Sequence, residues 1–464
     1  MEKFDLMVIG GGPGGYTAAI QAARQGMKAA LAEEAFLGGT CLNRGCIPTK
    51  ALLHAGEALQ SMSRCGELGL HCDNASFDFA AVHRRKDSVV EELRQGIGAL
   101  LQANGVTVYP CHARIAAPGL TAVADGEVAA DKILIATGSA PAALPLPGAD
   151  HPLIWNSDDV LSGEKPFPRR LIIVGGGVIG VEFATFFSDF GAQVTIVESL
   201  PRILANFDKS ISQNLSAILK KQGVTIYTDA QVQGFSGNAE EICCRFTAKE
   251  QVQDCTADAV VLAVGRRAVV EDVLAADMRL ELRQGRIVTD ENYQTSLPGI
   301  YAIGDVRFGS SQLAHGAAAE AVNMVRLTAG KPAPHALEHI PSCVYCRPEI
   351  AAVGLTPEQA KAQGLATVSG KYLMSGNGKT RIAGGERGFV QVTAEAGSGR
   401  LLGAQLMCER ATDMIFGLTA AIVNQLTVEQ ALAAVYPHPT FSEGIDEALG
   451  DILGCATHIL PKRR

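Results

Sequence analysis

The sequence has few aromatic residues and no long apolar run. Aromatic residues make up 5% of its 464 positions, and tryptophan occurs once. The apolar stretch that follows Met1 ends at Gly10, well short of the roughly 20 apolar residues that cross a bilayer. This start predicts an opening strand, and it indicates neither a signal peptide nor a transmembrane segment. We therefore expect a cytoplasmic protein that has no membrane partner.

Charge of one sign is not concentrated anywhere in the chain. The 40 basic and 48 acidic residues are dispersed and sum to a net charge of −8. Without a basic tract, binding to nucleic acid is not expected. A chain of this length exceeds a single core, so two to four domains are expected. The hydrophobic content of 47% and the 50 glycines are typical of a sheet-rich α/β protein with many tight turns.

Cysteine is not scarce, since the chain has 12. Without an export signal these thiols are expected in a reducing compartment, where disulfides are mostly catalytic. Most have no partner at a recognisable spacing and are expected to be small packing residues. Cys343 and Cys346 form a C-x-x-C pair, but no helix start follows to lower a thiol pKa, and no second pair completes a zinc site. We expect these two to pack, and we expect no metal site.

Cys41 and Cys46 lie five positions apart in a stretch rich in glycine. In an ideal helix, Cα atoms at this spacing are roughly 8–9 Å apart, whereas a disulfide tolerates at most about 7 Å. A bridge therefore needs a bent or loosened turn, which Gly39 and Gly45 permit. Such a strained bridge is easily reduced. The spacing favours a cycling disulfide over a structural one.

Two complete dinucleotide-binding patterns stand 165 positions apart. In the first, a strand at residues 4–9, a glycine turn, a helix from Tyr16 to Gln25 and a strand at residues 28–32 lead to Glu33. In the second, the corresponding acid is Glu198. The glycines let the backbone approach a pyrophosphate, and the acid can accept a hydrogen bond from a ribose hydroxyl. The first turn contains Gly10, Gly12, Gly14 and Gly15, and the second contains Gly175, Gly177 and Gly180.

Two such patterns in one chain predict two dinucleotides, and with a redox disulfide they predict electron transfer between them. Glu198 would repel a 2′-phosphate, so the second site favours NAD over NADP, although Arg202 is nearby. His438 lies between two prolines, and Glu443 follows five positions later. An acid at that spacing could orient the imidazole as a base for a thiol, but a structural turn would explain the same residues.

These motifs resemble those of the flavoprotein disulfide reductases, and within that family the dihydrolipoamide dehydrogenases. The segment GGTCLNRGCIPTK, the two glycine turns, the run Tyr301–Val306 and the H-P-T-x-x-E run from His438 carry the resemblance across nearly the whole chain. The resemblance implies tight, non-covalent FAD at the first turn and NAD+/NADH at the second. It also implies that Cys41 exchanges with the substrate, that Cys46 faces the flavin, and that His438 with Glu443 is the base.

The resemblance further implies that Lys50 lies near the flavin, partnered by Glu182. For His315 alone, a structural role is the commoner explanation. The implied FAD-binding residues are the four glycines of the first turn with Glu33, Glu34, Gly39, Thr40, Lys50, Ala113, Thr137, Gly138, Ser139, Asp305, Gln312, Leu313, Ala314 and His315. The implied NAD-binding residues are Gly175, Gly177, Val178, Ile179, Gly180, Glu182, Glu198, Val232 and Gly265.

The implied fold is α/β, with two Rossmann-like dinucleotide-binding domains and a C-terminal α+β dimerisation domain. Glycine- and proline-rich breaks give an FAD-binding domain at 1–146, an NAD-binding domain at 147–268, a second part of the FAD or central domain at 269–336, and the C-terminal domain at 337–464. The helix expected from Thr412 to Gln425 has little polar face, which predicts burial on nearly all sides in a homodimer.

The implied activity is oxidation of protein-bound dihydrolipoamide by NAD+, within 2-oxo acid dehydrogenase or glycine cleavage complexes. The implied partners are a second copy of the chain and the lipoyl domain of an acyltransferase or of a glycine-cleavage carrier. An alternative is a glutathione-reductase-like enzyme that reduces another small disulfide with NADPH, but this needs basic residues where Glu198 stands. A second alternative is a flavoprotein kept only as a structural or peptide-binding subunit of a larger complex. Such a protein would be expected to have lost one of the residues needed for electron transfer, but all of those named above are present.

Ala268–Val269 replaces the family's usual Pro-Asn, and Cys346 its usual threonine, so local geometry should differ there.

Overall fold

The computed structural model describes residues 2–124, 126–385 and 387–460. These residues form two compact units, each built from several stretches of the chain. Within the described ranges, unit 1 comprises residues 2–169, 234–243 and 257–337, and unit 2 comprises residues 170–233, 244–256 and 338–460.

A seven-stranded sheet forms the centre of unit 1, in the order β3-β2-β1-β6-β5-β4 with β19 against β6. Strands β1, β2, β3, β6 and β19 are parallel, whereas β4 and β5 are antiparallel. The strands are β1 (Lys3–Ile9), β2 (Ala29–Ala32), β3 (Thr107–Tyr109), β4 (Arg114–Ala117), β5 (Leu120–Val123), β6 (Gly126–Ile135) and β19 (Ile300–Ala302).

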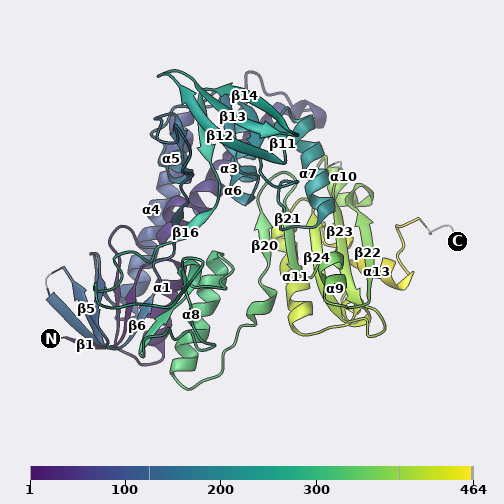
Figure 1. Cartoon of the computed structure of the whole chain (residues 1–464). Helices are drawn as coiled ribbons and strands as arrows, with labels where there is room; N and C mark the ends of the chain where they lie inside the picture. Colours follow the sequence, from purple (N-terminus) through teal and green to yellow (C-terminus); the bar gives the residue numbers. More distant parts are fainter. Residues whose placement is uncertain (1, 125, 386, 461–464) are drawn as a thin grey trace. The chain divides into compact units, whose positions relative to one another are not determined.

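Both faces of this sheet are buried, as is usual for parallel strands. Leu6 and Val8 of β1 pack with α1 (Pro13–Arg24) and α8 (Ala314–Thr328), which lie side by side in Figure 1. Met7 and Ile9 point into a second core on the opposite face.

Helix α1, predicted from Tyr16, starts three residues earlier, at Pro13, because proline suits the first turn of a helix.

The redox segment and its supports are helical. Helix α2 (Gly39–Arg44) packs on α3 (Cys46–Ser63), which packs on the long helix α4 (Phe79–Ala103). The remaining elements of unit 1 are η1 (Cys65–Leu68), β7 (Ser139–Pro141), β8 (Ile154–Trp155), α5 (Ser157–Ser162), β15 (Ala259–Leu262), β16 (Arg266–Ala268), β17 (Leu282–Arg283), β18 (Arg286–Ile287) and η2 (Gly304–Val306). Strands β12 (Ala230–Gly237), β13 (Ile242–Ala248) and β14 (Gln251–Ala257) and the turn η3 (Leu337–His339) have residues in both units.

Unit 2 contains three parallel strands of Rossmann type and an antiparallel sheet. The parallel strands are β9 (Arg170–Val174), β10 (Gln193–Val197) and β11 (Thr225–Tyr227), connected by α6 (Val178–Asp189) and α7 (Lys209–Lys221). The antiparallel sheet has the order β20-β21-β24-β23-β22. Its strands are β20 (Ser342–Val344), β21 (Ile350–Gly354), β22 (Thr367–Leu373), β23 (Phe389–Glu395) and β24 (Leu401–Met407).

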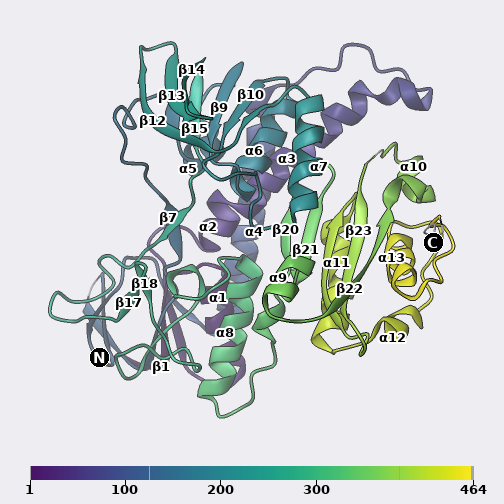
Figure 2. The same cartoon turned by 45° about the vertical axis from the view of Figure 1, so that its right-hand side comes forward.

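Two helices cover this antiparallel sheet and share one core with it, α11 (Ala411–Val423) and α13 (Glu443–Leu453), visible in Figure 2. Helix α11 is predicted to be buried on nearly all sides in a homodimer, and this stays a prediction. In the single chain the face that meets the sheet is covered and Phe416 is 75% exposed. The other elements of this part are α9 (Pro357–Ala362), η4 (Met374–Gly376), α10 (Gly378–Ile382) and α12 (Val428–Leu432). No helix in the described ranges is both long and apolar enough to cross a membrane.

Candidate active site

The first glycine turn joins β1 to α1. Gly10 has a φ of +103°, which favours glycine. A Cβ on Gly15 would lie 1.8 Å from the carbonyl oxygen of Gly10, so helix and strand can approach this closely only without a side chain there. Glu33, directly after β2, accepts hydrogen bonds from the backbone N–H groups of Gly11 (2.7 Å) and Ala35 (2.9 Å). These two hydrogen bonds hold the carboxylate of Glu33 beside the glycine turn.

The second glycine turn, between β9 and α6, repeats this geometry in detail. Gly175 has a φ of +108°, and a Cβ on Gly180 would lie 2.0 Å from the Gly175 carbonyl oxygen. Glu198 accepts hydrogen bonds from the N–H groups of Gly176 (2.5 Å) and Leu200 (2.7 Å), and it is buried. The correspondence predicted from the 165-residue offset thus extends to individual hydrogen bonds.

Both turns fit the pyrophosphate of a dinucleotide. Gly12 and Gly177 precede the first residues of α1 and α6. A Cβ on Gly177 would meet nothing within 4 Å, and one on Gly12 would meet only the Cα of Gly39 at 3.9 Å. A ligand can therefore approach each helix N-terminus, where N–H groups point outward. Glu33 and Glu198 keep acceptor capacity for a ribose hydroxyl, because each carboxylate oxygen has two lone pairs.

The Cys41–Cys46 segment lies against the first glycine turn. A Cβ on Gly39 would lie 2.6 Å from the Cα of Gly12, so the two segments touch through glycine alone. Helix α2 ends before Gly45 and α3 begins after it, which is the break in helical geometry that the spacing predicted. The two cysteines face one another across this break. Hydrogen bonding between the thiols, followed by burial, raises the pKa of Cys41 above its usual value.

Arg266 connects Thr40, the residue before Cys41, with Ser139 and through it with the Asp305 turn. Its guanidinium donates to the carbonyl oxygen (2.6 Å) and the hydroxyl (2.8 Å) of Ser139, and the Ser139 hydroxyl donates to Asp305 (2.6 Å). It also reaches the hydroxyl of Thr40 at 3.4 Å. Burial lowers the pKa of Arg266, while the charges of Asp305 and, more weakly, Cys46 oppose that change.

A buried ion pair holds the Asp305 turn from the other side. Glu320 on α8 accepts from the N–H of Gly304 (2.7 Å) and from Arg307 (2.5 Å), and its side chain is 2% exposed. The altered loop of Ala268–Val269 is also anchored, since the Thr137 hydroxyl donates to the Val269 carbonyl oxygen at 2.6 Å. Arg266, Arg307 and Glu320 support this site without having been predicted from the sequence. Arg266 directly follows Gly265, a predicted cofactor-binding residue, and this position was an available signal.

His438 and Glu443 form the predicted pair. The Nδ1 atom of His438 lies 2.7 Å from Oε1 of Glu443, and the second oxygen accepts from the N–H of Thr440 at 2.8 Å. Because a carboxylate only accepts, Nδ1 carries the proton and Nε2 is the basic atom. Burial acts to raise the pKa of Glu443, but the hydrogen bonds from His438 and Thr440 outweigh it, so the net pKa is lowered. Glu443 therefore stays ionised and orients the ring.

Glu182 on α6 is buried and accepts a hydrogen bond from the N–H of Tyr345 at 3.0 Å. Two turns further along the same helix, Asp189 forms an ion pair with Arg347. Cys346 lies between these anchors, where burial followed by the charge of Glu182 raises the pKa of its thiol. The C-x-x-C stretch therefore packs against α6 with an unreactive thiol. Whether Glu182 partners Lys50 stays a prediction.

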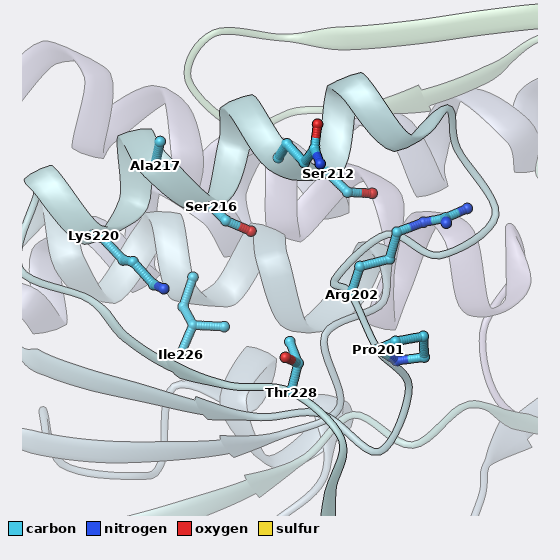
Figure 3. A pocket seen from close by; sticks show the side chains of 9 residues that line it. Pro201, Arg202, Ser212, Ser216, Ala217, Lys220, Ile226 and Thr228 are labelled. Carbon is cyan, nitrogen blue, oxygen red and sulfur yellow. The ribbon is translucent and has the colours of Figure 1, made fainter. Parts of the chain in front are cut away.

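Arg202 is bound to the backbone of its own loop. Its guanidinium donates to the carbonyl oxygens of Ala205 (2.9 Å) and Phe207 (3.3 Å). A cavity of about 360 Å³ lies between α7 and the end of β11, and in Figure 3 Ser216 and Lys220 point into it while the guanidinium of Arg202 points away. A second cavity, of about 380 Å³, lies on the other side of Arg202. Neither cavity includes Glu198 or the glycine turn.

The other predicted cofactor residues lie at element ends or on nearby strands. Leu313 precedes α8, Ala314 begins it, and His315 is its second residue. Val178 and Ile179 begin α6, and Val232 is a half-buried residue of β12. Ala113 is buried, Glu34 and Gln312 are exposed, Gly14 packs against Ile303, and Gly138 and Gly265 have positive φ.

Comparisons with known proteins agree with this geometry. Residues 4–321 match the family described as pyridine nucleotide-disulphide oxidoreductase, and residues 340–449 match its dimerisation domain. A dihydrolipoyl dehydrogenase of Bacillus subtilis is 35% identical and covers 98% of this chain and 99% of the relative. A dihydrolipoyl dehydrogenase of Chlorobaculum parvum is 38% identical and covers 96% of each chain.

Solved structures show the same fold. The HOCl-induced flavoprotein disulfide reductase RclA from Escherichia coli has a TM-score of 0.86 at 27% identity, covering 96% of this chain and 99% of that one. LpdA from Mycobacterium tuberculosis has a TM-score of 0.88 at 24% identity, covering 97% and 99%. The fold comprises an FAD-binding domain, an NAD-binding domain and a C-terminal dimerisation domain, so a homodimer follows. With two glycine turns that fit FAD and NAD(H), the chain belongs to the pyridine nucleotide-disulphide oxidoreductase family.

Proposed function

We propose that this enzyme is a dihydrolipoyl dehydrogenase, which oxidises dihydrolipoamide to lipoamide with NAD+ as acceptor. The observation that carries the proposal is the contact between the thiols of Cys41 and Cys46 beside the first glycine turn. Two cysteine thiols that contact one another can form a disulfide, and such a disulfide can exchange with a dithiol substrate. Relatives named dihydrolipoyl dehydrogenase, 34–38% identical over nearly the whole chain, support the choice of substrate.

The reaction starts from the disulfide form of the two cysteines. The Nε2 atom of His438 accepts the proton of one substrate thiol, and the resulting thiolate attacks the sulfur of Cys41. The Cys41–Cys46 bond breaks, and Cys46 leaves as a thiolate that Arg266 stabilises. The second substrate thiol then attacks the first substrate sulfur, and its proton passes to the sulfur of Cys41, which leaves as a thiol. The substrate has become a cyclic disulfide, and its two electrons reside on the enzyme's cysteines.

Bound FAD supplies the two-electron relay between these thiols and NAD+. The chain's own residues hold the two cofactors. Gly12 and Gly177 admit the pyrophosphates, and Glu33 and Glu198 bind the riboses. Asp305, braced by Ser139 and Glu320, supports the ribityl or phosphate region of FAD.

We further propose that each active site is shared, with His438 and Glu443 of one chain serving the cysteines of its partner. The exposed imidazole, whose side chain is 78% exposed, supports this arrangement. The lipoyl domain of an acyltransferase or of a glycine-cleavage carrier is the proposed macromolecular partner, and a cytoplasmic location is proposed with it. The buried carboxylate of Glu198 argues against an NADPH-dependent reductase of another small disulfide.

The test is a steady-state assay of the FAD-loaded dimer with three substrate pairs: dihydrolipoamide with NAD+, dihydrolipoamide with NADP+, and glutathione disulfide with NADPH. We expect turnover only with the first pair, and its loss in Cys41→Ser. Faster turnover of glutathione disulfide with NADPH would refute the proposal.

A further inference from the structure

A second imidazole–carboxylate pair lies next to the first. The Nδ1 atom of His458 is 2.7 Å from Oε1 of Glu447, the same distance as between His438 and Glu443. The second oxygen of Glu447 accepts from the backbone N–H of His458 at 2.9 Å. In the first pair the second oxygen of Glu443 likewise accepts a backbone N–H. The two pairs therefore have the same hydrogen-bond design.

Both carboxylates are on α13, four residues apart and thus on the same helix face. Glu447 is buried, whereas the side chain of His458 is 69% exposed. As in the first pair, Nδ1 of His458 must carry the proton, which leaves Nε2 as an exposed basic atom. A buried anion that orients an exposed imidazole is the arrangement of a proton carrier.

The two pairs interact electrostatically. The charge of His458 contributes to lowering the pKa of Glu443. The other titratable groups around them are Asp446 on α13 and Tyr372 on β22. Burial, followed by the charge of Glu447, raises the pKa of each of these two groups, so the phenol of Tyr372 keeps its proton and does not act as a base.

We propose that His458, held by Glu447, passes to solvent the proton that His438 removes from the substrate. This inference rests on the proposed function. Oxidation of a dithiol releases two electrons and two protons, whereas NAD+ takes two electrons and one proton. One proton per turnover must therefore leave the site. In a shared site the substrate and the partner chain would cover His438, so a second imidazole, held by a carboxylate of the same helix, offers the proton a way out.

The test compares His458→Gln with the unchanged FAD-loaded dimer in dihydrolipoamide oxidation. In dilute non-imidazole buffer we expect kcat to fall by about tenfold, at the lower end of what proton transfer contributes. Excess imidazole should restore it, because a free imidazole can carry the same proton. A fall in kcat that imidazole does not rescue, or no fall at all, would overturn the proposal.

Controls separate the relay from structural damage and from the proposed function. His54→Gln removes an exposed imidazole that is 3.6 Å from Glu57 on α3, and it should leave kcat unchanged in both buffers. If His458→Gln dissociates the dimer in sedimentation, Glu447→Gln replaces it, with the same expected dependence on imidazole. His438→Gln should be inactive in either buffer. An unchanged dimer that does not oxidise dihydrolipoamide would refute the proposed function, and an active His438→Gln would refute the role of His438 as the base. Buffer-independent kcat in both His458→Gln and Glu447→Gln would refute the relay alone.

Discussion

At the scale of single residues, Glu198 is the residue that we expect to set the preference between NAD+ and NADP+. Its carboxylate is buried and fixed by two backbone N–H groups, so it cannot swing away from a 2′-phosphate. Arg202, which could have neutralised such a phosphate, is bound to carbonyl oxygens of its own loop. The prediction of NAD preference therefore gains support from the positions of both charges.

We expect kcat/KM for NAD+ to exceed that for NADP+ by at least about 100-fold, or roughly 2.7 kcal/mol. Glu198→Ala should narrow this ratio because the repulsion of the phosphate is removed. Glu33→Ala is the matched control, since Glu33 has the same place in the first turn. It should weaken FAD binding and leave the ratio unchanged. Steady-state kinetics with both nucleotides measure the effect, and a ratio unaltered in Glu198→Ala would show that this acid does not select the cofactor.

At the scale of elements, α4 carries a buried basic pair against α5. The Lys86 ammonium donates to the carbonyl oxygen of Leu161 at 2.6 Å, near the C-terminal end of α5. One turn earlier, His83 is 3% exposed, and neither ring nitrogen has a hydrogen-bond partner among the described residues. Burial, followed by the charge of Lys86, lowers the pKa of His83 to about 4. A histidine that must stay neutral makes this contact sensitive to acid.

The sign of this effect follows from proton linkage. Between the ordinary pKa of histidine, about 6.5, and the folded value of about 4, the unfolded chain binds the proton and the folded chain does not. Stability is therefore lost as the pH falls through this window, by about 3 kcal/mol in total. Phenylalanine takes no proton, so His83→Phe does not lose stability in this window. The melting temperature of His83→Phe relative to that of the unchanged protein should therefore be higher at pH 5 than at pH 7.5. Thermal melts at the two pH values test this, with the exposed His54→Phe as a control that should show no such shift.

At the scale of the whole molecule, the dimer should complete the active site. Helix α11 leaves Phe416 exposed, as expected for a face that a second copy covers. Homodimers of Cys41→Ser and of His438→Ala should each be nearly inactive. Subunit exchange between them should restore activity, because one of the two sites in a heterodimer combines intact cysteines with an intact histidine. A mixture that exchanges subunits, shown by sedimentation of tagged chains, yet stays inactive would contradict the shared site.

The sequence by itself determined the local features of this protein. The glycine turns, the acids at Glu33 and Glu198 and the helix break at Gly45 depend on backbone sterics and on short-range periodicity, so their spacing revealed them. The pairing of His438 with Glu443 spans only five residues and could be predicted with the help of the resemblance. The helix bounds were less certain, and α1 and α11 each begin before the predicted residue.

Only the tertiary structure decided the contacts between distant segments. Arg266 meets Ser139 across 127 positions, and Ser139 meets Asp305 across 166. Glu447 meets His458 beyond the end of α13, where no periodic pattern continues. Such hydrogen bonds form because buried polar groups must find partners once the core has packed. The sequence contains many donors that could pair with a given buried acceptor. Only the packing of the chain decides which of them lies within hydrogen-bond distance.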